Sequence, residues 1–153
     1  ECPAPVADCR PECCRPAWAA RERGFMTMFH HVSIGVADLE RSAAFYDAVM
    51  AALGHTRFME KPGTVSWWPT GGGQALWINQ RDDLTVVPDD GRHIAFQAQS
   101  RAQVDAFHAA AMVAGATDDG APGVRPEYRD TYYGAFVLDP DGHKLEAVHA
   151  PRD

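Results

Sequence analysis

The stretch HVSIGVADLERSAAFYDAVMAALG, residues 31–54, decides the fold, because a related stretch follows it in the same chain. Residues 93–116 read HIAFQAQSRAQVDAFHAAAMVAGA and align with it without a gap, at an offset of 62 residues. The six identical positions include three non-alanine pairs, which are His31 and His93, Phe45 and Phe107, and Met50 and Met112. A repeat of this kind predicts two copies of one structural module.

Each copy has the pattern of a strand followed by a helix. Residues 31–36 and 93–98 alternate between apolar side chains and others, which is typical of strands with one buried face. Asp38 and Ser100 occupy the same repeat position, where a side-chain oxygen can cap the N-terminus of a helix. Gln103 adds a capping box to the second helix. Glycines then predict where the helices end, at Gly54 and Gly115.

Further strands are predicted after each helix. They lie near residues 55–60, 64–68 and 74–80 in the first copy, and near 132–138 and 143–149 in the second. Residues 139–142 (DPDG) predict a hairpin turn, residues 117–130 a loop or weak strand, and residues 81–91 a polar linker. The predicted fold is α+β, with two tandem βαβββ modules whose curved mixed sheets enclose a central cavity.

The chain of 153 residues is long enough for one domain with a real core. We expect this domain over residues 28–149, with modules at 28–80 and 92–149 and a short tail at 150–153. Residues 1–27 hold all four cysteines and show no periodic pattern, so we interpret them as a non-native or disordered extension before a start at Met26 or Met28. Their spacing lacks the paired C-x2-C motifs of zinc ribbons.

Composition excludes several classes of partner. The formal net charge is −7 and the basic residues form no run, which argues against a nucleic-acid surface. No apolar run has the length of a membrane span. Because the body of the chain contains no cysteine, it fits a cytoplasmic protein that does not depend on disulfides.

Strand alternation identifies the candidate functional residues. His31 and Ser33 point away from the apolar residues of their strand, His93 and Gln97 do the same in the fifth strand, and Glu146 does so in the last. If the modules curl toward each other, His31, His93 and Glu146 converge, and two imidazoles with one carboxylate suit a divalent first-row metal. Alternatively, the histidines are ordinary hydrogen-bonded residues and Glu146 is solvated. Parity places the neighbouring His30 on the helix side, so His31 is preferred.

Three segments resemble one known family. Residues 29–47 (FHHVSIGVADLERSAAFYD), 93–98 (HIAFQA) and 139–148 (DPDGHKLEAV) are similar to the vicinal oxygen chelate superfamily of glyoxalases, bleomycin resistance proteins and extradiol dioxygenases. The resemblance covers about residues 28–149, and the second half is similar to an uncharacterised bacterial glyoxalase-like subgroup. It implies one divalent metal ion (Fe, Mn, Ni or Zn) at His31, His93 and Glu146. Relatives commonly dimerise, so the cavity forms within one chain or by exchange of modules between two.

One departure from the family pattern bears on the reaction. Glyoxalase I enzymes place a fourth acidic ligand, which is also the catalytic base, on the fourth strand of the first module. Here that strand reads QALWIN (residues 74–79), with no acid and with Trp77 or a neighbour in its place. The resemblance therefore argues against glyoxalase I activity. The three-ligand set is closer to that of extradiol dioxygenases and fosfomycin-resistance thiol transferases.

The remaining expectations concern substrate and catalysis. The candidates for a nearby acid–base group are Tyr132, Tyr133 and His143, of which Tyr133 is preferred. Substrate contacts are expected from Ser33, Trp77, Gln97 and Lys144. The expected function is a metalloprotein acting on a small oxygenated, metal-chelating molecule by lyase, isomerase or ring-cleaving dioxygenase chemistry. The alternative is a metal-free binding protein of the bleomycin-resistance type.

Overall fold

A computed structural model describes residues 28–69, 72–87 and 91–151 of the chain. The elements are β1 (His31–Val36), α1 (Leu39–Ala52), β2 (His55–Lys61), β3 (Thr64–Pro69), β4 (Ala75–Gln80), β5 (Ile94–Gln97), α2 (Arg101–Val113), β6 (Thr117–Val124), β7 (Tyr133–Leu138) and β8 (Lys144–His149). The predicted α+β fold of two βαβββ modules is confirmed, and the weak strand considered at residues 117–130 is β6. Residues 1–27, interpreted above as an extension, lie outside the described residues.

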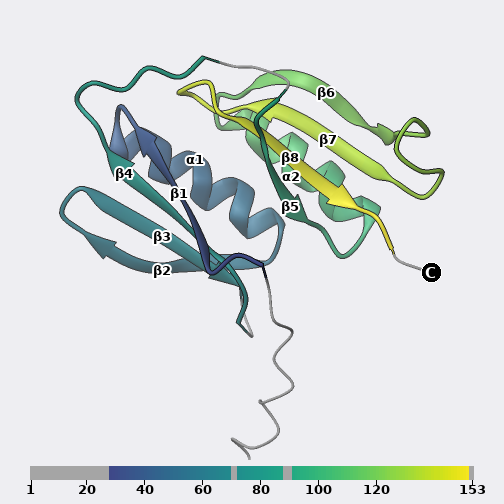
Figure 1. The fold of residues 1–153 in the computed structure, drawn as a ribbon, viewed down its shortest axis with the longest axis horizontal. Coiled ribbons are helices and arrows are strands. Elements are labelled where there is room, and N and C mark those ends of the chain that lie inside the picture. Colours follow the sequence, from purple (N-terminus) through teal and green to yellow (C-terminus); the bar gives the residue numbers. More distant parts are fainter. Residues whose placement is uncertain (1–27, 70–71, 88–90, 152–153) are drawn as a thin grey trace, which may run out of the picture.

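The two modules have the same sheet topology (Figure 1). The strand orders are β1-β4-β3-β2 and β5-β8-β7-β6, with β1 parallel to β4 and β5 parallel to β8. In the first sheet Ser33 lies opposite Trp77, and in the second Ala95 lies opposite Glu146. Since Ser33 and Ala95 are equivalent in the repeat, Trp77 occupies the position in the first module that Glu146 has in the second.

The helix boundaries follow from the predicted caps. The Asp38 side chain accepts a hydrogen bond from the backbone N–H of Arg41 at 3.0 Å. Ser100 accepts one from the N–H of Gln103 at 3.3 Å, and the Gln103 side chain accepts one from the N–H of Gln99 at 2.7 Å. These contacts satisfy donors that have no partner within the helix.

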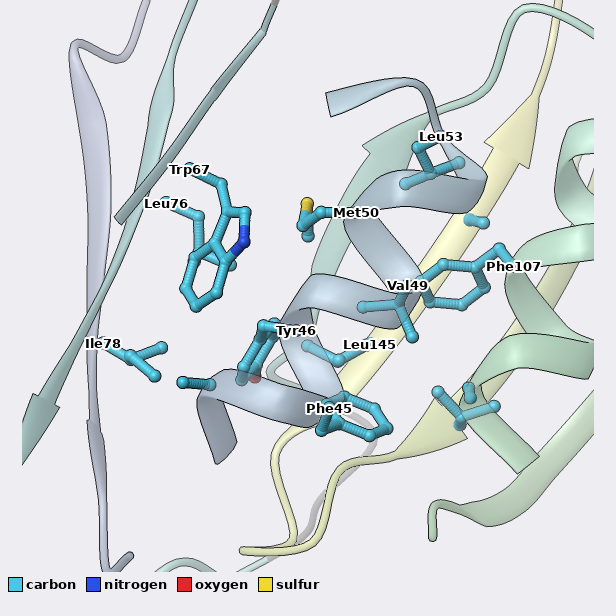
Figure 2. Close-up of a cluster of buried hydrophobic side chains, with 14 of the residues drawn as sticks. Phe45, Tyr46, Val49, Met50, Leu53, Trp67, Leu76, Ile78, Phe107 and Leu145 are labelled. Atoms are coloured by element: carbon cyan, nitrogen blue, oxygen red, sulfur yellow. The ribbon is translucent and has the colours of Figure 1, made fainter. Parts of the chain in front are cut away.

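One hydrophobic core unites the modules. Each helix packs on one face of its own sheet, and the two helices also pack on each other. Figure 2 shows Val49 of α1 beside Phe107 of α2, with Phe45 of α1 and Leu145 of β8 in the same buried cluster. The predicted apolar faces are therefore confirmed as the buried ones.

The second face of each sheet carries no helix, and we call it the open face of that sheet. Among the described residues, the two sheets form separate hydrogen-bonded systems, and the helices rather than the open faces meet in the core. The expected central cavity is thus not closed by contacts between the open faces of a single chain. No helix in the described part of the chain has the length and apolar character needed to cross a membrane.

Candidate metal and substrate site

The most strongly constrained polar residue is Glu146, at the middle of β8 on the open face of the second sheet. Its side chain is buried, with the residue only 1% exposed. Oε2 lies 3.1 Å from Nε2 of His93, and Oε1 accepts a hydrogen bond of 2.6 Å from the hydroxyl of Tyr132. A buried carboxylate needs such partners to offset the loss of hydration. Each of its oxygens is therefore held by a different side chain.

Tyr132 and Gly134 shape the space around this carboxylate. A Cβ atom at Gly134 would lie 3.0 Å from Oε1 of Glu146 and 3.3 Å from Cε1 of Tyr132, so only glycine fits there without displacing one of them. Burial, followed by the hydrogen bond and charge of Glu146, raises the pKa of Tyr132 above its ordinary value. The Tyr132 hydroxyl therefore stays protonated at neutral pH and donates to Glu146.

A cavity of about 400 Å³ opens beside His93 on the same side of the second module. Its walls include the aromatic ring of Phe136 and two cationic side chains, Arg125 and Lys144, whose charged groups lie 5.7 Å and 5.3 Å from the ring centre. Lys144 also forms an ion pair of 2.9 Å with Asp119. All the residues that line this cavity belong to the second module.

His31 lies on the open face of the first sheet. It is exposed, its Nδ1 is 2.9 Å from Nδ1 of His30, and its ring centre is 6.5 Å from that of Trp77. Ser33, on the same face, accepts a hydrogen bond of 2.7 Å from the side-chain amide of Asn79. This face therefore carries the predicted residues His31, Ser33 and Trp77 together.

The prediction that His30 lies on the helix side is wrong. His30 immediately precedes β1, and its Nδ1 contacts Nδ1 of His31 instead of packing under α1. Its ring is exposed and lies 6.4 Å from that of Trp68. The two histidines are consequently neighbours outside the core.

The structure brings two of the three predicted metal ligands together and leaves the third apart. His93 and Glu146 are in contact, whereas Nδ1 of His31 contacts Nδ1 of His30. Within the described residues, no group of three or more His, Cys, Asp or Glu side chains could hold a metal ion. The predicted ligand set is thus divided between the open faces of the two modules.

Of the three acid–base candidates, Tyr132 is the one in contact with Glu146. The hydroxyl of Tyr133 instead donates to Asp105 of α2 at 2.8 Å, on the helix side of the sheet. His143 reaches the carbonyl oxygen of Gly35 at 2.8 Å. The alternation along β7 could have identified Tyr132 from the sequence. Tyr133 shares a face with the buried Ala135 and Val137, whereas Phe136, on the other face, pairs with Glu146.

The expected substrate-contact residues fall in three places. Lys144 lines the cavity beside His93, while Ser33 and Trp77 lie on the open face of the first sheet. Gln97 is exposed on β5 and lines a separate pocket of about 640 Å³ at the seam between the modules, together with Trp68 and Ile94.

Comparison with known proteins adds the family. A family model described as the Glyoxalase/Bleomycin resistance protein/Dioxygenase superfamily matches residues 28–147. The chain is 31% identical over 133 residues to the uncharacterized protein YqjT of Bacillus subtilis (strain 168), a match that covers 78% of this chain and 96% of YqjT.

Two solved structures have the same fold. A glyoxalase/bleomycin resistance protein from Albidiferax ferrireducens T118 is 35% identical, with a TM-score of 0.71 over 82% of this chain and 100% of that one. A glyoxalase/bleomycin resistance protein/dioxygenase family enzyme from Burkholderia phytofirmans PsJN is 22% identical, with a TM-score of 0.63 over 80% and 98%. Together with the repeated modules and the matched sheet registers, these similarities show that the chain belongs to the glyoxalase/bleomycin resistance protein/dioxygenase superfamily.

Proposed function

We propose that the chain is a metalloprotein that acts on a small oxygenated molecule able to chelate its metal. The observation that carries this proposal is the buried carboxylate of Glu146, held beside Nε2 of His93. An imidazole nitrogen and a carboxylate oxygen are donors that suit Fe, Mn, Ni or Zn. When bound, such a metal would polarise a carbonyl or enolate oxygen of the substrate.

We further propose that His31 of a second copy completes the ligand set. In one chain His31 lies on a different open face from His93 and Glu146, and the cavity of about 400 Å³ beside His93 has no wall from the first module. A smaller pocket that His93 shares with Ile34 of β1 includes neither His31 nor Glu146. The open face of the first sheet has the character of a surface that a partner covers. Phe58 is 56% exposed there and packs on Trp68, with Trp77 half-buried nearby. Exposed apolar patches of this kind mark interaction sites.

Two-fold symmetry makes this arrangement self-consistent. If the first sheet of one copy covers the second sheet of another, the symmetry repeats the contact and forms two equivalent sites. Each site would then combine His31 and Trp77 of one copy with His93, Glu146 and Lys144 of the other.

The side chains around this site favour some reactions over others. Arg125 and Lys144 can bind the oxygen atoms of a substrate, and Trp77 can provide an aromatic wall. Since Trp77 takes the place of the fourth acidic ligand, glyoxalase I chemistry lacks its catalytic base here. Lyase, isomerase or ring-cleaving dioxygenase chemistry on another chelating substrate is the proposed class.

The test is metal analysis of protein purified without a chelating tag. We expect the wild type to bind one equivalent of Fe, Mn, Ni or Zn per chain, directly or after reconstitution, and His93→Ala to bind much less. His108→Ala is the matched control, because His108 contacts Asp118 between α2 and β6, away from Glu146. If the wild type takes up none of the four metals, the metalloprotein proposal is wrong.

The alternative is a binding protein that captures a small molecule without a metal. It is favoured by the absence of a three-residue ligand group among the described residues and by the aromatic open face of the first sheet. In that case a ligand would bind equally well in the presence of EDTA, and His93→Ala would not remove binding.

A further inference from the structure

We propose that Tyr132 is a positioning residue, which holds Oε1 of Glu146 so that the carboxylate offers only Oε2 to a divalent metal. This inference rests on the proposed function, since it concerns how this chain's own residues prepare the metal site. It assigns a role to a residue whose neighbour in sequence, Tyr133, faces the opposite side of the sheet.

The two oxygens of Glu146 contact different side chains. A carboxylate can bind a metal through one oxygen or through both. Here Oε1 is engaged by the Tyr132 hydroxyl at 2.6 Å, and Oε2 lies 3.1 Å from Nε2 of His93. A short hydrogen bond to a charged acceptor is among the strong ones, and Glu146 is only 1% exposed, so water competes little for Oε1. Oε2 and Nε2 of His93 contact each other in this structure, and a metal that replaces this contact would have the two of them as its donor atoms.

Tyr132 is itself held by its neighbours in the turn between β6 and β7. Its backbone N–H donates to the carbonyl of Arg129 at 2.9 Å, and its carbonyl accepts from the N–H of Arg125 at 2.8 Å. Its ring also packs edge-on against that of Tyr128, with the centres 5.0 Å apart. The turn between β6 and β7 thus fixes the tyrosine before any ligand arrives.

The contact between Tyr132 and Glu146 depends on the space at Gly134. Gly134 leaves room for both Oε1 of Glu146 and the ring edge of Tyr132, since a Cβ there would lie within 3.0 Å of the oxygen. A carboxylate that uses one oxygen leaves a coordination position that a two-oxygen carboxylate would fill. The arrangement therefore keeps that position for water or substrate.

The experiment compares Tyr132→Phe with Tyr133→Phe. Both changes remove one hydroxyl that donates to a carboxylate, but the second removes it on the helix side, at Asp105. Mn²⁺ affinity is measured from the EPR signal of free Mn²⁺, and the coordination of Co²⁺ from its visible absorption. Because loss of a group that orients a metal ligand weakens binding ~10- to 100-fold, we expect that loss for Tyr132→Phe. We also expect its Co²⁺ spectrum to shift toward higher coordination.

The control and the contrary outcomes separate the two proposals. Tyr133→Phe should bind Mn²⁺ within about twofold of the wild type, with an unchanged Co²⁺ spectrum. If the wild type binds the metals and Tyr132→Phe matches it in affinity and spectrum, the positioning role is wrong and the metal site stands. A lower melting temperature with an unchanged spectrum would likewise reduce Tyr132 to a structural residue. If the wild type binds neither metal, and none of Fe, Ni and Zn, the proposed function itself is overturned.

Discussion

The hydroxyl of Tyr46 in α1 donates a hydrogen bond of 2.7 Å to Oδ2 of Asp139, at the start of the turn between β7 and β8. The other oxygen of Asp139 accepts the backbone N–H groups of Asp141 and His143. Asp141 in turn receives hydrogen bonds from Arg41 at 2.6 Å and Ser42 at 2.9 Å. The turn that leads into β8, the strand of Glu146, is therefore hydrogen-bonded to α1 of the first module.

We predict that Tyr46→Phe lowers the free energy of unfolding by about 1–3 kcal/mol, the usual effect of leaving a buried acceptor without its donor. Tyr46 is 0% exposed and Asp139 only 4%, so water does not replace the lost hydrogen bond. Burial, then the charge of Asp139, raises the pKa of Tyr46 well above its ordinary value, so the effect should be the same at pH 6 and pH 8. Urea unfolding measures it. Tyr128→Phe, at a residue 62% exposed, should change stability little, and an equal effect there would contradict the assignment.

His55 gives a prediction about acid sensitivity. Burial lowers the pKa of His55 below its ordinary value of 6.5, and the backbone of Gly54 offsets only part of this effect. The neutral ring is thus favoured in the folded state, so its contribution to stability is present above about pH 6.5 and is lost as the pH falls through the lowered pKa. We expect His55→Gln to reduce the loss of unfolding free energy between pH 7 and pH 5. If the unfolding free energies of the variant and the wild type fall equally between pH 7 and pH 5, the prediction is wrong.

The repeat and the strand alternation predicted the fold because both are local properties of the sequence. Val36 and Leu145 are buried and His31 is exposed, as the period of two requires. The contact between modules was not predictable in this way, since alternation shows which face is apolar and not which surface will cover it. For the same reason, alternation could not show that His31 lies on a different open face from His93 and Glu146.

Two smaller differences have local causes. Residues 117–124 have a poor strand composition, rich in Gly, Pro and Asp, and they form β6 because they pair with β7 at the edge of the sheet. Proximity to the closing hairpin does not distinguish Tyr132 from the preferred candidate Tyr133. The pairing of Phe136 with Glu146 shows that even-numbered positions of this segment face the carboxylate.

We predict that Gly134→Ala weakens metal binding by at least about tenfold, because the new methyl group displaces Oε1 of Glu146 or the ring of Tyr132. Isothermal titration with Mn²⁺ or Zn²⁺ measures the affinity. Ala135→Gly is the control, since Ala135 is buried on the opposite face and its loss should reduce stability by roughly 0.5–1 kcal/mol without changing affinity. Unchanged affinity in Gly134→Ala would show that the carboxylate is not held as tightly as its contacts suggest.

A mixing experiment tests whether the site lies between two copies. His31→Ala and His93→Ala should each lose metal binding, because each removes one ligand from both sites of a dimer. When the two variants are unfolded together and refolded, half of the chains on average enter mixed dimers. In such a dimer one site carries both substitutions, and the other combines His31 of one copy with His93 and Glu146 of its partner. We therefore expect metal binding to return in the mixture, at one equivalent per mixed dimer.

The matched control mixes His93→Ala with Glu146→Gln. Both residues lie in the second module and contact each other within one chain, so every site of that mixed dimer lacks one ligand. No binding should return there. If His31→Ala and His93→Ala also fail to complement each other while the wild type binds metal, the ligands come from a single chain. His31 must then approach His93 and Glu146 by a rearrangement, because in this structure the described residues contain no group of three such side chains that could hold a metal ion.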